Sequence, residues 1–250
     1  MLSNLHVSTV RLSRELPRGS YLNDLPVVRN LKEMGILRFT RPVTFLVGEN
    51  GIGKSTLIEA IAVNMGFNPE GGTVNFSFAT ENSHSELYDY ISVGKGLARR
   101  RDGFFLRAES FYNAASYIDQ LDREPGLGGR LIDSYGGVSL HRQSHGESFM
   151  SLVENRFGGN GIYILDEPEA ALSPSRLLEL MYHMHELVKD NSQFIISTHS
   201  PILMAYPDAE VLLLTQESIT SVDYRETEHF QLTKQFLNAP EVMFRHLFAE

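Results

Sequence analysis

Three short runs of apolar residues stand out along the chain, at 43–47, 162–165 and 194–196. Each is rich in β-branched or aromatic residues, a pattern typical of strands buried on both faces of a parallel sheet. Between the last two runs, apolar residues recur at helical spacing from Leu177 to Val188, which predicts a crossover helix with one buried face. These patterns predict a βαβ unit within an α/β fold that has a mainly parallel central sheet.

The flanking segments predict smaller elements. Residues 5–12 have the pattern of a strand, and the N-terminal region as a whole predicts antiparallel strands that flank the main sheet. Glycine pairs interrupt residues 111–157, which predicts a helical insertion subdomain joined by loops. The tail predicts two short helices, at 231–237 and 240–248. We expect all of these elements to belong to one domain that spans residues 1–250.

Composition narrows the class of protein. The chain has 250 residues, of which 42% are hydrophobic and 21% charged, as expected for a folded domain. A net charge of -9 disfavours a general attraction to nucleic acid or anionic lipid. The absence of cysteine excludes disulfides and thiolate metal sites. No apolar run reaches the roughly 18 to 20 residues of a membrane span, so we expect a cytoplasmic protein without an integral membrane segment.

Residues 48–56 fit the phosphate-loop spacing G-x-x-x-x-G-K-S, and they follow a predicted strand and open a predicted helix. The glycines allow backbone N–H groups to point at phosphate oxygens. Lys54 then contacts the β and γ phosphates, and the Ser55 hydroxyl ligates Mg²⁺. The base is read elsewhere, with Tyr21 and Phe39 as aromatic candidates. The predicted nucleotide-binding residues are Gly48, Asn50, Gly51, Gly53, Lys54, Ser55 and Thr56.

Two carboxylates follow the strand predicted at 162–165, at the end of the strand where open α/β sheets bind ligands. Asp166 is suited to orient Mg²⁺, and Glu167 to accept a proton from the water that attacks the γ phosphate. After the run at 194–196, His199 can hydrogen-bond the γ phosphate or the same water. The predicted catalytic residues are therefore Lys54, Glu167 and His199, and the predicted metal ligands are Ser55 and Asp166.

The order of these motifs resembles that of ABC-type ATPases: a phosphate loop, an acidic strand end and a Ser-Thr-His strand end. Residues 167–174 and the sequence 198–201, Thr-His-Ser-Pro, are similar to the non-transporter branch, which includes AAA-family ATPases and RecF-like, OLD-like and SMC-like heads. The resemblance covers about residues 43–211. It implies a P-loop NTPase fold, ATP hydrolysis with Mg²⁺, and a homodimer that holds ATP at its interface.

The resemblance also implies a signature motif before the acidic strand, where residues 143–147 read Gln-Ser-His-Gly-Glu. In the family, a serine and a glycine of this motif bind the γ phosphate held by the opposite subunit. Those roles fall on Ser144 and Gly146, while the other three positions depart from Leu-Ser-Gly-Gly-Gln. The alternative is that Ser144 only caps a helix predicted at 147–155.

Two further roles follow from the resemblance alone. The position of the family's Mg²⁺-sensing glutamine holds Glu109, a weaker candidate metal ligand, with Gln120 and Gln143 as alternatives. The segment 171–173 is placed at the dimer interface.

A basic run at 99–101, with Lys95 and Arg107 nearby, is the one local exception to the acidic balance. It suits either a DNA backbone or a solvated loop. The sequence thus favours an ATP-dependent dimerisation switch, followed by a DNA-metabolism or defence ATPase. The altered signature disfavours a transporter motor subunit, and the complete catalytic set disfavours a non-catalytic scaffold. DNA or an unidentified protein is a possible partner.

Overall fold

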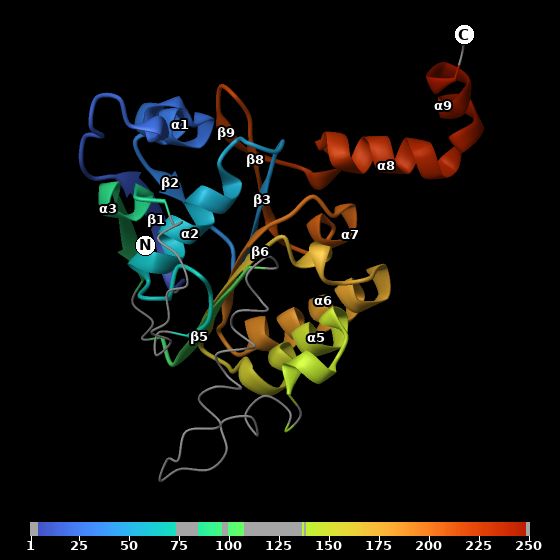
Figure 1. Cartoon of the computed structure of the whole chain (residues 1–250), viewed down its shortest axis with the longest axis horizontal. Coiled ribbons are helices and arrows are strands. Elements are labelled where there is room, and N and C mark those ends of the chain that lie inside the picture. The colour runs from blue at the N-terminus through green and yellow to red at the C-terminus, as the bar shows by residue number, and fades with distance from the viewer. Residues whose placement is uncertain (1–4, 74–84, 97–99, 108–136, 138, 249–250) are drawn as a thin grey trace.

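The computed structural model describes residues 5–73, 85–96, 100–107, 137 and 139–248, and its centre is a six-stranded sheet (Figure 1). The strands lie in the order β5-β6-β7-β3-β8-β9. The first five run parallel, and β9 pairs with β8 antiparallel. Their bounds are β3 Val43–Val47, β5 Asp102–Arg107, β6 Gly161–Asp166, β7 Gln193–Ser197, β8 Glu210–Leu214 and β9 Ile219–Val222.

The three apolar runs of the sequence form β3, β6 and β7 in the middle of this sheet, and every residue of these strands is buried. Alternate residues face two separate cores. Phe45 and Leu165 belong to the core on one side, and Leu46 and Ile164 to the core on the other. Burial on both faces explains why the runs are continuously apolar rather than alternating.

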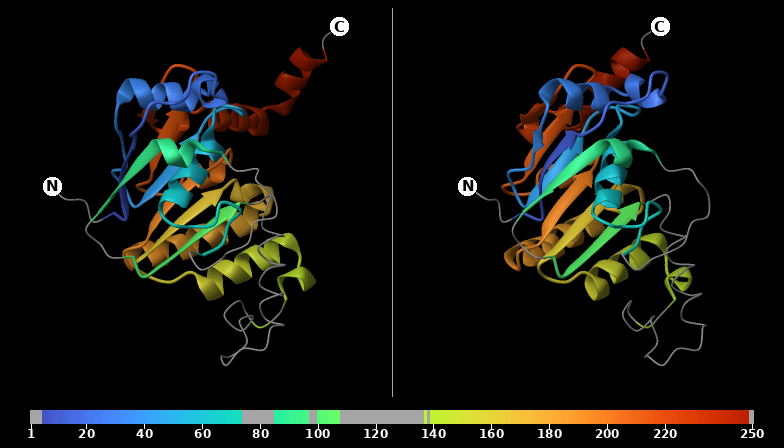
Figure 2. Two further views of the ribbon diagram at one scale, coloured as in Figure 1. Left: turned by 60° about the vertical axis from the view of Figure 1, so that its left-hand side comes forward. Right: turned by 90° about the vertical axis from the view of Figure 1, so that its left-hand side faces the viewer.

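Helices cover both faces of the sheet (Figures 1 and 2). On one face lies α2, Lys54–Asn64, and on the other lie α5, His145–Arg156, and α6, Pro174–Lys189. The predicted crossover helix is α6, since it connects β6 to β7. A short helix, α7 (Pro201–Met204), follows β7.

The N-terminal strands form a separate three-stranded antiparallel sheet in the order β2-β1-β4. Its strands are β1 Val7–Leu12, β2 Leu37–Arg38 and β4 Ile91–Lys95. The antiparallel flanking strands are therefore confirmed. Sequence reasoning missed α1, Pro26–Met34, which begins with a proline at its first turn and buries Val27, Val28 and Leu31. Shorter helical turns lie at η1 Tyr21–Asp24 and α3 Leu87–Tyr90.

Two C-terminal helices extend away from the rest of the molecule (Figures 1 and 2). They are α8, Glu228–Asn238, and α9, Pro240–Leu247, which confirms the two predicted tail helices. The first begins earlier than expected because the Thr227 hydroxyl accepts a hydrogen bond from the Phe230 N–H and caps it. None of the helices in the described ranges combines the length and apolar character that crossing a bilayer requires.

Most of the predicted insertion subdomain at 111–157 falls outside the described residues, as do Glu109, Gln120 and Arg99. The described part of it includes η3 Leu140–Arg142 and α5. The division of the chain into a core and a helical subdomain stays a prediction.

Candidate nucleotide site

The loop between β3 and α2 has the backbone of a phosphate-binding turn. Gly48, Gly51 and Gly53 all have positive φ angles, of 155°, 81° and 101°, a region that side chains disfavour. Two of these positions are also crowded. A Cβ at Gly48 would lie 2.3 Å from the Leu214 carbonyl oxygen, and one at Gly53 would lie 2.4 Å from a Val27 methyl carbon. Backbone conformation thus favours glycine at all three positions, and packing also favours it at Gly48 and Gly53.

Lys54, the first residue of α2, is buried within this loop. Its Nζ donates hydrogen bonds to the Gly48 carbonyl at 2.8 Å and to the Glu49 carbonyl at 3.0 Å. Burial lowers the pKa of Lys54, and the charge of Glu167 and two neighbouring carboxylates opposes this only in part. The loop carbonyls therefore hold the ammonium group where a phosphate would meet it.

Asp166 lies at the carboxyl end of β6, and groups from three other elements meet it. The Ser55 hydroxyl of α2 donates to Asp166 Oδ1 at 3.1 Å, and the Ser197 hydroxyl at the end of β7 donates to the same oxygen. Arg107, the last residue of β5, places its Nε 3.6 Å from Asp166 Oδ2. Serine hydroxyl and carboxylate oxygens are the hard ligands that Mg²⁺ prefers, so Ser55 and Asp166 fit such an ion.

Arg107 corrects one interpretation of the sequence. Although it lies near the basic run at 99–101 in the sequence, its Nη1 lies 2.6 Å from Glu59 Oε2, and the Glu59 side chain is only 6% exposed. Arg107 is therefore committed to an ion pair inside the domain rather than to a DNA backbone. Glu59 gave no signal in the sequence, because an acidic residue within a helix is ordinarily solvated.

Glu167 follows Asp166 with a left-handed backbone, at φ 51° and ψ 56°. Its N–H donates to the Ser197 carbonyl at 3.1 Å, which fixes this turn. The side chain is 40% exposed, and its Oε1 lies 3.5 Å from His199 Nε2. Two predicted catalytic residues, from the ends of β6 and β7, thus lie beside each other above the phosphate loop's edge of the sheet.

His199 is held from both its backbone and its ring. Its N–H donates to Glu169 Oε1, and its Nδ1 lies 2.8 Å from Nε2 of His229 in α8. Burial and the charge of Lys54 lower the pKa of His199, and burial also lowers the pKa of His229. Burial raises the pKa of Glu169. Sequence reasoning missed His229, since nothing in its spacing links it to the motifs.

Comparisons with known proteins agree with this geometry. A family model described as "AAA domain, putative AbiEii toxin, Type IV TA system" matches residues 138–205, and one described as "AAA domain" matches residues 28–122. The nucleoside import ATP-binding protein NupA of Lactococcus lactis is 26% identical over 209 residues, which are 76% of this chain and 40% of NupA. The Retron Vc95 probable ATPase of Vibrio cholerae is 30% identical over 134 residues, which are 47% of this chain and 25% of that protein.

Residues 28–122 and 138–205 are thus similar to AAA-family ATPase domains. The fold of the chain is similar to that of a putative metal-chelate type ABC transporter in an inward-facing conformation, with a TM-score of 0.50 and 14% identity over 94% of this chain and 90% of that one. The chain spans less than half the length of the curated relatives named above.

The predicted signature residues lie at the start of α5. Ser144 is the N-cap: its hydroxyl accepts from the Glu147 N–H at 3.4 Å, and Glu147 Oε2 accepts from the Ser144 N–H at 2.9 Å. This capping box gives a local reason for glutamate at position 147. A Cβ at Gly146 would lie 3.3 Å from the Ala171 carbonyl oxygen, so the signature helix packs near the segment 171–173 of its own chain.

The remaining candidates of the sequence are placed as follows. Phe39 is 4% exposed and belongs to a hydrophobic core, so it is not available to stack on a base. Tyr21 is 56% exposed, and its hydroxyl donates to Ser85 at 3.1 Å. The guanidinium of Arg100 donates to the Met65 carbonyl and lies 4.8 Å from the centre of the Phe67 ring. The described part of the basic run therefore includes an inward-facing arginine.

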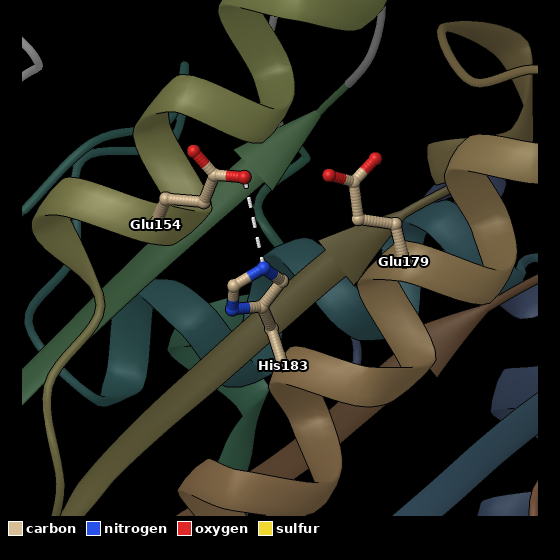
Figure 3. A group of neighbouring side chains, drawn as sticks. All are labelled: Glu154, Glu179 and His183. Carbon is tan, nitrogen blue, oxygen red and sulfur yellow. Dashed lines mark ion pairs between the residues drawn. The ribbon is translucent and has the colours of Figure 1, made fainter.

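A group outside the phosphate site was not foreseen. Glu154 of α5 and Glu179 and His183 of α6 point toward one another (Figure 3), with their potential ligand atoms within 4.8 Å. Arg176 already pairs with Glu179 at 2.6 Å, and this cation counts against a metal ion there. We assign the group to packing between the two helices.

Proposed function

We propose that this chain is an ABC-type ATPase domain, which binds Mg²⁺ and ATP and hydrolyses the bond to the γ phosphate. The observation that carries the proposal is the convergence of Lys54, Ser55, Asp166, Glu167 and His199 at one edge of the sheet, although they come from three distant parts of the sequence. The loop N–H groups and Lys54 bind the phosphates, and Lys54 exchanges its carbonyl partners for phosphate oxygens.

Ser55 and Asp166 hold the Mg²⁺ ion in this proposal. When bound, the ion neutralises charge on the β and γ phosphates. The Ser197 hydroxyl orients Asp166, since it donates to the same carboxylate. Glu109 remains a weaker candidate ligand that lies outside the described residues.

Glu167 is the proposed general base. Its carboxylate is partly exposed beside His199, so it can accept the proton of a water molecule poised to attack the γ phosphate. His199, kept neutral by burial and by Lys54, donates a hydrogen bond to the phosphate or to that water. Each of the three predicted catalytic residues, Lys54, Glu167 and His199, therefore has one role in the proposed reaction.

Beyond ATP hydrolysis, we propose that two copies of the chain form an ATP-dependent dimerisation switch. Ser144 and Gly146 at the N-terminus of α5 would contact the γ phosphate bound by the partner, where backbone N–H groups and the helix dipole favour an anion. ATP would then stabilise the closed dimer through contacts that hydrolysis removes.

Two biological settings are open to such a switch. The first is a role in DNA metabolism or defence, which the resemblance to the non-transporter branch implies. The alternative is a motor subunit of a membrane transporter, which similarity to a nucleoside import protein supports. We favour the first because the sequence ends its histidine motif with Ser200 and Pro201, as the non-transporter branch does. A cytoplasmic location fits either setting.

The test is the mass in solution of Glu167→Gln with and without Mg-ATP, together with its turnover. We expect ATP to double the mass and turnover to fall by about 100-fold or more, because the general base is lost. The double variant Glu167→Gln/Lys54→Ala is the matched control and should stay monomeric. If Glu167→Gln binds ATP but stays monomeric, the dimerisation switch is wrong while ATP binding stands. If its turnover equals that of the wild type, Glu167 is not the general base.

A further inference from the structure

The start of α8 is fixed against the body of the domain. Thr227 is fully buried, and its hydroxyl donates to the Tyr224 carbonyl at 2.6 Å while it caps the helix through the Phe230 N–H. The Phe230 ring packs edge-on against Tyr224, with centroids 5.1 Å apart. His229 lies in this anchored first turn, so the fixed start of the helix presents its ring to the site.

His229 meets His199 ring nitrogen to ring nitrogen. Its Nε2 lies 2.8 Å from His199 Nδ1, a hydrogen-bond distance that requires one nitrogen to donate and the other to accept. The lowered pKa values of both rings, which burial causes first, favour two neutral imidazoles. Each neutral ring carries only one N–H, so the choice at this contact fixes the tautomers of both.

The other edge of His199 decides between the two choices. Its Nε2 is buried without a hydrogen-bond partner in the described part of the chain and lies 3.5 Å from Glu167 Oε1. A carboxylate oxygen accepts hydrogen bonds, so an N–H at Nε2 is favoured over a lone pair that faces Glu167. With the hydrogen on Nε2, His199 Nδ1 accepts and Nε2 of His229 donates. The reverse arrangement would turn a lone pair of His199 toward the carboxylate.

From this geometry we infer that His229 is a positioning residue, which holds His199 as the Nε2–H tautomer with that N–H directed at Glu167 and the γ phosphate position. The inference rests on the proposed function and extends it, since neither family match, at 28–122 and 138–205, reaches His229. It also makes the C-terminal helix α8 part of the hydrolytic site, although α8 supplies no residue to the phosphate loop or to the Mg²⁺ ligands.

The experiment compares His229→Phe, which keeps a flat ring without a donor, with His229→Gln, whose amide N–H can replace the lost donor. The exposed His185→Phe of α6 is the control. In His229→Phe we expect single-turnover hydrolysis to slow about tenfold to hundredfold, part of what a positioned acid–base group contributes. ATP affinity should change little, and His229→Gln should recover most of the rate.

The imidazole ¹⁵N shifts of His199, recorded without nucleotide, give a second readout. They should report a single Nε2–H tautomer in the wild type and in His229→Gln, and a mixture in His229→Phe. An unaltered tautomer and rate in His229→Phe would overturn the inference, as would equal losses in both variants. If the wild type hydrolyses no ATP, the proposed function fails, while the ¹⁵N shifts still decide whether His229 sets the tautomer.

Discussion

The Ser55 hydroxyl donates a hydrogen bond to Asp166 Oδ1 across 3.1 Å, although 111 residues separate the two in the sequence. One lies on the first turn of α2 and the other at the end of β6. They meet because parallel strands end at the same edge of the sheet, where the helix that follows β3 also begins. The same edge brings Ser197 to Asp166 from β7, so hydroxyl groups from two other elements position this carboxylate.

Lys54→Ala should weaken ATP binding by about tenfold to hundredfold. A hydrogen bond to a charged group contributes about 1.5–3 kcal/mol, and each 1.4 kcal/mol is tenfold in affinity. Calorimetric titration with ATP in the presence of Mg²⁺ measures the change. Lys32→Ala, at an exposed position of α1, is the control. Equal affinity in the Lys54 and Lys32 variants would contradict the phosphate-loop assignment.

Gly48→Ala should lower the free energy of unfolding by about 1–3 kcal/mol through overpacking, in addition to the cost of its backbone conformation, since its Cβ would overlap the Leu214 carbonyl. Gly51 also has a positive φ, but a Cβ there meets nothing within 4 Å. Gly51→Ala should therefore lower the free energy of unfolding by only about 1–2 kcal/mol, which is the cost of placing alanine in a left-handed backbone conformation. Urea denaturation of both variants separates the cost of crowding from the cost of backbone conformation. Equal losses of unfolding free energy in the two variants would argue against the contact with Leu214.

Arg107→Met should lower the free energy of unfolding by about 3–5 kcal/mol, because it leaves the buried Glu59 carboxylate without its guanidinium. Arg101→Met, at an exposed position of the same basic run, should change it by less than about 0.5 kcal/mol. Urea denaturation at pH 7 measures both. Adding Glu59→Gln to Arg107→Met should restore part of the loss, and an additive loss instead would show that the pair does not carry the effect.

Arg156→Met should destabilise the fold in a pH-dependent manner. Asp102 Oδ1 accepts from Arg156 at 2.8 Å, and Oδ2 accepts from the Tyr163 hydroxyl at 2.8 Å. Burial by itself raises the pKa of Asp102, but the hydrogen bond and charge of Arg156 and the Tyr163 hydroxyl bring it below its ordinary 3.8. A carboxylate whose pKa falls on folding stabilises the protein above its unfolded pKa, and this contribution is lost as the pH falls through the folded pKa.

We therefore expect Arg156→Met to cost about 1–3 kcal/mol at pH 7, with the difference from the wild type narrowing as the pH falls below about 4. Urea denaturation over this pH range measures it. Arg225→Met removes the exposed pair with Asp223, at 3.2 Å, and should have little effect at any pH. A difference that stays constant with pH would exclude the Asp102 carboxylate as its source.

The sequence by itself predicted the three middle strands of the central sheet and those residues of the candidate site that lie within motifs. The apolar runs of β3, β6 and β7, the helical stripe of α6 and the glycine spacing of the phosphate loop are local patterns, and each carries its own physical requirement of burial, periodicity or backbone conformation. The order of the motifs then sufficed to place their ends at one edge of a parallel sheet.

Only the tertiary structure decided which side chains outside the motifs join them. Arg107 turns inward to Glu59 and Asp166 rather than toward solvent, Phe39 is buried in a core, and His229 reaches His199 from the C-terminal helix. Such pairings depend on where distant elements pack, and a charged or aromatic residue carries the same sequence signal whether it faces water or the site. Long-range packing, which has no period along the chain, supplied that information.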